Sequence, residues 1–233
     1  MVKKITKRIK AVQALVDATK TYSLKDAIVA LKKTPKLKFD ETVEISVKLN
    51  VDPKDSQSAS FRGTVSLPHG TGRKVRVAVF CKGEEERKAK DAGADFVGAE
   101  DLIAKVQGGW ADFDVAVATP DMMKDMAKLG KILGPRGLMP NPKSGTVTMD
   151  TAKTIKEVKA GKIEFKMDKQ AGIHAPLGKV SFTEDALYNN ALTLIDAIMG
   201  SGNQAIKGQH VKTLYISTTM GPGIKLDLGE FRK

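Results

Sequence analysis

The hydrophobic period changes twice along the chain, and this change constrains the fold more than any other feature of the sequence. From Thr42 to Asn50 apolar and polar residues alternate, which predicts a half-buried strand with one polar face. From Val75 to Ala118 short apolar strands alternate with helical segments, which is typical of a parallel sheet covered on both faces. The pattern typical of antiparallel strands then returns in three segments, Lys162–Met167, Gly178–Phe182 and Val211–Ser217.

The simplest fold class with this pattern combines α+β and α/β: a discontinuous α+β domain formed by both ends of the chain, with an inserted α/β domain. Pro68 to Gly72 form a turn cluster, and Gly161 ends a predicted helix over Thr151–Ala160. We therefore expect a first domain of residues 1–67 and 159–233 and an inserted domain of residues 68–158, joined by two glycine-containing linkers that suit a hinge. Further helices are predicted over Lys3–Thr19, from Ser23 to Pro35 with Ser23 as the capping residue, and over Glu184–Met199. A last short strand of the inserted domain is predicted over Thr146–Thr148.

The charge of the chain indicates an anionic partner. The formal net charge is +12, and the isoelectric point is about 9.6. Residues 1–67 carry a net +7 and residues 159–233 a net +3, whereas residues 68–158 carry only +2. The two ends are therefore expected to form one basic body. Aromatic residues are only 5% of the chain, which argues against a surface built mainly on base stacking.

Several features bear on the cellular compartment. The single cysteine, Cys81, allows no internal disulfide and fits a reducing compartment. No apolar run follows the N-terminal lysines, and no apolar stretch approaches the length needed to span a membrane. We expect a cytoplasmic protein without a signal peptide or a membrane anchor.

Residue patterns for catalysis, metals or nucleotides are weak. The three histidines, His69, His174 and His210, lie far apart, and no spacing supports a metal site. The glycines at 70 and 72 precede a predicted strand instead of following one, and the segment from Gly134 to Gly137 lacks the Lys-Ser/Thr ending of a P-loop. We expect no enzyme activity, cofactor or metal, and an enzyme built on the inserted domain stays open as the alternative.

The segment from Leu133 to Thr146 contains three prolines and three glycines, so no helix or central strand can run through it. Leu138 and Met139 give it apolar anchors, and Arg136 and Lys143 give it positive charge. It is either an ordered loop with a fixed shape or a turn-rich connection between two elements.

Two segments favour binding to RNA. The polar side chains of Thr42, Glu44, Ser46 and Lys48 share one face of a predicted strand. The segment from Ser217 to Gly223 ends another strand in hydroxyls and glycines, which would let a phosphate or a ribose 2′-OH approach the backbone closely. The alternative for the second segment is a plain turn after a strand.

Four separated segments resemble the family of large-subunit ribosomal protein number one, of bacterial type. They are Lys38–Glu44, Leu67–Gly72, Gly134–Lys143 and Ser217–Gly221, in the order expected for that family. The resemblance implies that the first domain is a split β-α-β domain similar to an RNA-recognition sheet. It implies that the inserted domain is a Rossmann-like three-layer α/β/α domain without a dinucleotide.

The resemblance also implies a function. The protein would bind a three-way junction in large-subunit rRNA and form the mobile side stalk near the tRNA exit site, where it would assist release of deacylated tRNA. It would also bind its own operon mRNA and repress translation, and it would be a monomer when free of the ribosome. The alternative is a protein that acts mainly as an mRNA-binding regulator.

The family's RNA contacts can be carried onto matching positions of this chain. The RNA-binding positions implied are Lys38, Phe39, Thr42, Glu44, Lys166, Asp168, Ser217, Thr219, Met220 and Gly221. A secondary contact loop is implied at Gly134, Arg136, Gly137 and Lys143. The carboxylates of Glu44 and Asp168 would accept hydrogen bonds from 2′-OH groups or base amines, or would hold a lysine in place. Phe39 would either pack beneath the site or stack on a base, and no role is assigned to His174.

Overall fold

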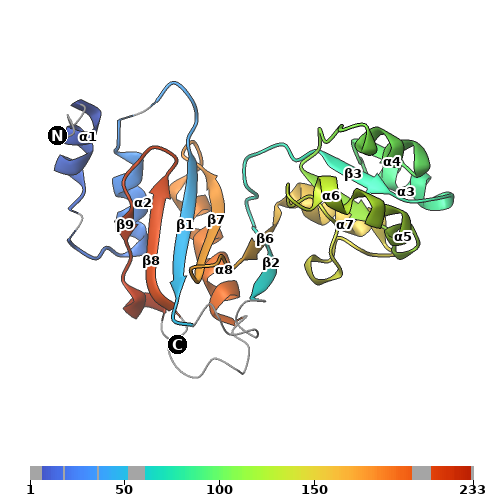
Figure 1. Cartoon of the computed structure of the whole chain (residues 1–233). Helices are drawn as coiled ribbons and strands as arrows, with labels where there is room; N and C mark the ends of the chain where they lie inside the picture. The colour runs from blue at the N-terminus through green and yellow to red at the C-terminus, as the bar shows by residue number, and fades with distance from the viewer. Residues whose placement is uncertain (1–6, 18, 36, 52–60, 201–210, 232–233) are drawn as a thin grey trace, which may run out of the picture. The chain divides into compact units, whose positions relative to one another are not determined.

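The computed structural model describes residues 7–17, 19–35, 37–51, 61–200 and 211–231. The chain has a mixed α/β fold with several sheets, as predicted (Figure 1). It forms two compact units, one of residues 1–72 and 163–233 and one of residues 73–162.

A four-stranded antiparallel sheet, in the order β7-β1-β8-β9, organises the first unit. The strands are β1 (Thr42–Leu49), β7 (Gly172–Lys179), β8 (Val211–Thr218) and β9 (Ile224–Lys225). Ser46, in the middle of β1, lies opposite His174 on β7 and Tyr215 on β8. The predicted strand over Gly178–Phe182 is wrong. The strand begins earlier and ends at Lys179, whose carbonyl accepts a hydrogen bond from the Phe182 N–H in a turn.

One face of this sheet is buried because every second residue of β1 is apolar. Val43, Ile45, Val47 and Leu49 join one hydrophobic core with side chains of α2 (Leu24–Lys32) and α8 (Glu184–Gly200). Figure 1 shows both helices on the same side of the sheet. Fully burying such a side chain contributes about 1.5–3 kcal/mol. Among the described residues no helix covers the opposite face of the sheet, as the alternating pattern predicts.

The predicted capping residue Ser23 begins α2, since its side-chain oxygen accepts the Asp26 N–H. The N-terminal helix α1 spans Lys7–Leu15. The helix was predicted to run from Lys3 to Thr19, but it ends at Leu15, and Val16 and Asp17 are not helical. Residues 3–6 and 18 lie outside the described part of the chain.

A second, two-stranded sheet joins the same core. It pairs β2 (Arg62–Ser66) with β6 (Lys162–Lys166). The rings of Phe61 and Phe165 have centroids 6.2 Å apart. Gly63 must lack a side chain, because a Cβ there would lie 2.5 Å from the Phe165 ring.

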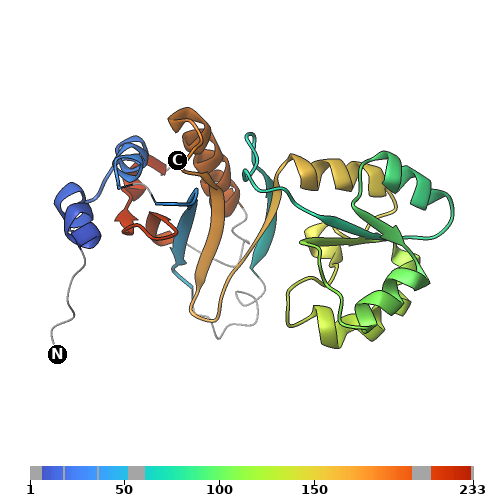
Figure 2. The ribbon, with the colours of Figure 1, turned by 90° about the horizontal axis from the view of Figure 1, so that it is seen from above.

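The second unit contains a parallel sheet of three strands in the order β4-β3-β5. The strands are β3 (Val77–Phe80), β4 (Phe96–Gly98) and β5 (Val115–Ala118). Every residue of β3 is fully buried, because helices cover both faces (Figure 2). The helices α3 (Glu84–Asp91) and α7 (Thr151–Ala160) pack on the side of Val77 and Val79, and α4 (Glu100–Gln107), α5 (Met123–Met126) and α6 (Gly130–Leu133) pack on the side of Ala78 and Phe80.

The proline-rich segment after α6 is an ordered loop. Gly137 and Gly145 adopt positive φ angles of 70° and 67°. The Asn141 side-chain oxygen accepts the Lys143 N–H at 2.9 Å and begins a 3₁₀ turn, Pro142–Ser144. The Thr146 hydroxyl oxygen accepts the Asn141 N–H at 2.8 Å. The predicted strand over residues 146–148 is present only as one parallel bridge between Val147 and Ala118.

Candidate nucleic-acid interface

The uncovered face of the four-stranded sheet carries polar side chains from three strands. The register brings together Glu44, Ser46 and Lys48 of β1, His174 and Pro176 of β7, and Thr213, Tyr215 and Ser217 of β8. These side chains alternate with the buried ones of the core face. We call this surface the open sheet face.

Thr219 closes one end of the open sheet face. Its backbone N–H donates to the Thr42 carbonyl at 3.0 Å, and its hydroxyl oxygen accepts the Thr42 N–H at 3.0 Å. The hydroxyl of Thr219 is therefore already used to hold β8 against β1. Two residues further into the sheet, Glu44 lies opposite Ser217.

The turn after β8 is tight and partly exposed. The Met220 N–H donates to the Glu41 carboxylate at 2.9 Å, while 58% of Met220 is exposed. The Gly221 N–H donates to the Thr218 carbonyl at 3.0 Å. Gly221 does not have a positive φ, and a Cβ there would lie only 2.2 Å from the Thr218 hydroxyl. Glycine is needed at 221 for close packing and not for an unusual backbone angle.

Lys38 and Phe39 lie just before β1, and both are exposed, Phe39 to 53%. They line a hollow of about 410 Å³ together with Leu37, Asp40, Glu41, Val180 and Ser181. The Phe39 ring is more than half exposed and is therefore accessible to a base, but its role stays a prediction.

Asp168 organises the opposite end of the open sheet face. One of its carboxylate oxygens accepts the N–H groups of Gly172 at 2.6 Å and Gln170 at 2.8 Å. These hydrogen bonds, of which the one from Gly172 has the largest effect, hold the pKa of Asp168 below its ordinary value of 3.8. The nearby His174 and Lys48 lower the pKa further. The other carboxylate oxygen lies 3.7 Å from His174 Nε2.

His174 and Lys48 complete this second end. His174 Nδ1 lies 3.0 Å from the Ser46 hydroxyl oxygen, and Lys48 Nζ donates to the Gln170 carbonyl. With Asp168, Thr213 and Tyr215 they line a hollow of about 270 Å³. Lys166 lies beside His174, because Met167 pairs with Ile173 in an antiparallel bridge.

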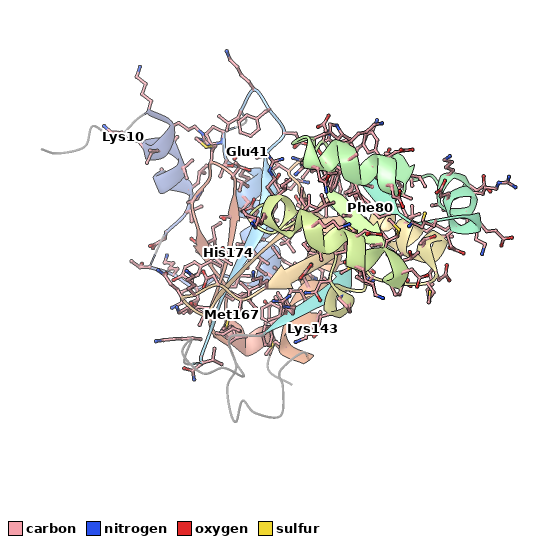
Figure 3. All side chains as sticks on the ribbon, turned by 45° about the vertical axis from the view of Figure 1, so that its right-hand side comes forward. Lys10, Glu41, Phe80, Lys143, Met167 and His174 are labelled. Atoms are coloured by element: carbon pink, nitrogen blue, oxygen red, sulfur yellow. The ribbon has the colours of Figure 1, made fainter. Side chains whose placement is uncertain are left out.

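The structure thus separates the predicted RNA-binding residues into two groups. Thr42 and Lys48 are six residues apart on β1, which corresponds to about 20 Å at about 3.3 Å per residue. Figure 3 labels Glu41 near the first end and His174 further along the sheet. The first group contains Lys38, Phe39, Thr42, Glu44, Ser217, Thr219, Met220 and Gly221, and the second contains Lys166 and Asp168.

Four residues that lie beside these two groups were not predicted as part of the site: Glu41, His174, Thr213 and Tyr215. The alternation along β8 was available as a signal for Thr213 and Tyr215. No local pattern marks Glu41, which lies in a charged run and is nevertheless only 5% exposed.

The predicted secondary loop belongs to the second unit. Gly134, Arg136, Gly137 and Lys143 are all exposed, and Figure 3 labels Lys143. Within the described residues neither Arg136 nor Lys143 forms an ion pair. Both charges are therefore available to an anionic partner.

The second unit has little that suits catalysis. Burial raises the pKa of the Cys81 thiol to about 11, so this thiol is a poor nucleophile. The first turn of α3 carries Glu84, Glu85 and Glu86, which would repel a phosphate at that helix end. Across the described ranges no three metal-ligating side chains come together, and no helix there is long and apolar enough to cross a membrane. His210 lies outside the described residues.

An open sheet face with hydroxyl groups, together with exposed cations and an exposed aromatic ring beside it, is typical of proteins that bind RNA. The chain belongs to the ribosomal protein L1p/L10e family, whose model matches residues 31–222. It is 53% identical over 225 residues to the large ribosomal subunit protein uL1 of Protochlamydia amoebophila (strain UWE25), which covers 97% of this chain and 95% of that protein. The predicted family, of bacterial type, is confirmed. The family consists of structural RNA-binding proteins and not of enzymes, in agreement with the prediction of no enzyme activity.

Proposed function

We propose that this protein is a structural constituent of the large ribosomal subunit in the cytoplasm and that it binds large-subunit rRNA through the open sheet face. The observation that carries the proposal is the first end of that face. There Phe39 and Met220 are exposed next to the backbone of the tight turn at Gly221. The relative in Protochlamydia amoebophila is named as a large ribosomal subunit protein, which supports the same assignment.

The proposal includes a division of labour between two domains. A split β-α-β domain of residues 1–67 and 159–233 would bind the RNA, and a Rossmann-like three-layer domain of residues 68–158 would be inserted in it. The two compact units support this division, with boundaries after Gly72 and Lys162. Residues 68–72 lie with the first unit, because the buried Asn190 side chain accepts the His69 N–H and donates to the Gly70 carbonyl.

Within the site, the first group of residues would make the main contacts and the second group a separate one. Thr219 would act chiefly by holding β8 to β1, since its hydroxyl is bonded to the Thr42 backbone. Met220 and Phe39 would contact the RNA with their side chains. Asp168 and Lys166 would contact the RNA at a second point, about 20 Å along the sheet from the first group. The loop at Arg136 and Lys143 would add a secondary contact from the second unit.

The finer functions are part of the same proposal. The rRNA site would be the junction that carries the mobile side stalk, and movement of the stalk would assist release of deacylated tRNA from the exit site. The same face would bind the protein's own operon mRNA and repress its translation. The protein would be a monomer when it is not on the ribosome.

Co-sedimentation with large ribosomal subunits tests the proposal. The protein should sediment with the subunits at low salt and be stripped by high salt, with a slope of log affinity against log salt of about −0.7 to −0.9 per phosphate contact. A control with an excess of the operon mRNA leader separates the two RNA targets. The proposal is wrong if the protein stays in the supernatant at low salt. If the protein stays in the supernatant and binds the mRNA leader, it acts mainly as a regulator.

A further inference from the structure

An ion pair between the buried Glu41 and the half-buried Arg8 lies next to the first end of the open sheet face. The Glu41 carboxylate is nearly inaccessible to solvent, and one of its oxygens accepts the Met220 N–H at 2.9 Å. Its other oxygen faces Arg8 Nη2 of helix α1 at 3.6 Å. Glu41 thus connects the N-terminal helix with the turn that exposes Met220.

Arg8 acts on Glu41 through its charge. Its Nε and Nη2 atoms are buried and have no hydrogen-bond partner among the described residues. A carboxylate that is buried without an opposing charge is strongly destabilised, so Glu41 without Arg8 would turn toward solvent. That movement would take the carboxylate away from the Met220 N–H.

We propose that Glu41 is a positioning residue for RNA binding: held by Arg8, it fixes the Met220 backbone, so that docking of α1 and affinity for RNA are coupled. The inference rests on the proposed function, because it places Met220 in the RNA site. Glu41 itself is buried and does not contact the RNA. The coupling makes the N-terminal helix part of the site without a direct contact.

The test compares Arg8→Met and Glu41→Ala with Glu41→Gln, which keeps an oxygen acceptor for the Met220 N–H. Lys10→Met is the matched control, since it removes one positive charge from an exposed position of the same helix (Figure 3). Two quantities are measured: the rate of hydrogen exchange of the Met220 amide without RNA, and the dissociation constant for large-subunit rRNA. A thermal melt of each variant verifies folding.

Arg8→Met and Glu41→Ala should each speed Met220 exchange and weaken rRNA binding by about tenfold, while Lys10→Met changes both by less than about threefold. Glu41→Gln keeps the acceptor for the Met220 N–H but loses the charge that faces Arg8, so its effects should fall between those of Glu41→Ala and Lys10→Met. Unchanged Met220 exchange in Glu41→Ala overturns the inference. So does an affinity loss in Arg8→Met no larger than that in Lys10→Met. Should Glu41→Ala fail to fold, Arg8→Met and its control still decide. If the wild-type protein does not bind rRNA, the proposed function itself has failed. The exchange measurement is made without RNA, so it still tests separately whether Arg8 and Glu41 hold the Met220 backbone.

Discussion

The two units differ in how many faces of their central sheet are covered by helices. In the first unit, β1 buries only every second side chain, and helices cover one face of its sheet. In the second unit, every residue of β3 is buried, and helices cover both faces. The first sheet therefore presents a broad polar surface, whereas the second can present only the loops at its ends.

This difference decides how each unit can meet a large anionic partner. A sheet face holds side chains from neighbouring strands in a fixed register, so Glu44, Ser46 and Ser217 keep their spacing. The loop that carries Arg136 and Lys143 offers exposed charge on a turn-rich backbone. We expect the sheet face to determine which RNA is bound and the loop to add electrostatic affinity.

Replacing Asn190 should have the largest effect, and it should be confined to the first unit. The buried Asn190 side chain bonds to the backbone of His69, Gly70 and Leu177 at 2.7–3.1 Å. Asn190→Ala leaves these groups without partners, at a cost of about 1–3 kcal/mol for each group that stays buried. Because Leu177 is buried and Gly70 is partly buried, the free energy of unfolding, from denaturant titration, should fall by about 3 kcal/mol.

The exposed neighbour Asn189 supplies the control, since Asn189→Ala removes the same amide without a buried bond. Hydrogen exchange should accelerate in residues 68–72 of the Asn190 variant and stay unchanged in β3 and β5. Equal acceleration in both sheets would contradict the view that the two units are separately stabilised.

Gly221→Val should have the next largest effect. The added side chain would meet the Thr218 hydroxyl, 2.2 Å from the new Cβ, and the turn must shift to make room. Such overpacking costs about 1–3 kcal/mol. Because the displaced turn carries Met220, rRNA affinity should fall by more than tenfold in a titration.

Gly223→Ala is the matched control, because a Cβ there would make an ordinary contact of 3.8 Å with the Tyr215 ring. Gly223→Ala should change the free energy of unfolding by less than about 0.5 kcal/mol and the rRNA affinity by less than about twofold. Equal losses in the two variants would mean that the turn tolerates no change at all and that the contact with Thr218 has no special role.

Both kinds of sheet could be predicted from the sequence. The alternation of apolar and polar residues in β1 predicts burial on one face, and the continuous apolar run of β3 predicts burial on both faces. The sequence was also sufficient for the Ser23 cap and for the family. The start of β7 was missed, since Gly172, Pro176 and Gly178 interrupt the alternation that marks a strand. The separation of Asp168 from Thr219 and the burial of Glu41 depend on strand register and on packing by α1. Contacts between distant segments of this kind leave no local pattern.

Removing the second unit should have a modest effect on RNA binding. Gly72 and Ile163 belong to the same unit, so residues 73–162 can be replaced by a short Gly/Ser bridge. The shortened protein should fold and bind rRNA with a loss of roughly tenfold or less, due to the missing cations of the loop. The variant Arg136→Ala/Lys143→Ala in the full chain should lose a similar amount. If the shortened protein folds and has no preference for rRNA over a random RNA, the main site lies in the second unit.

Asp168→Asn should have the smallest effect, and it should appear only in the pH dependence of stability. The pKa of Asp168 is lowered in the folded protein, chiefly by the hydrogen bond from the Gly172 N–H. The charged Asp168 therefore stabilises the fold above about pH 4. That contribution is lost as the pH falls through the lowered folded value. The amide oxygen of the variant side chain can still accept the N–H groups, but the charge that faces His174 and Lys48 is gone.

The Asp168 side chain is 44% exposed, so solvent screening limits the loss to less than about 1 kcal/mol at neutral pH. Unfolding free energies measured between pH 2 and 7 should show wild type and Asp168→Asn converging at the acid end and separating above pH 4. Asp121→Asn, at an exposed position of the second unit, removes the same charge and should show a smaller separation. A constant difference across the whole range would mean that the substitution acts through packing of the turn. The second end of the open sheet face would then owe its shape to the backbone bonds alone and not to the charge of Asp168.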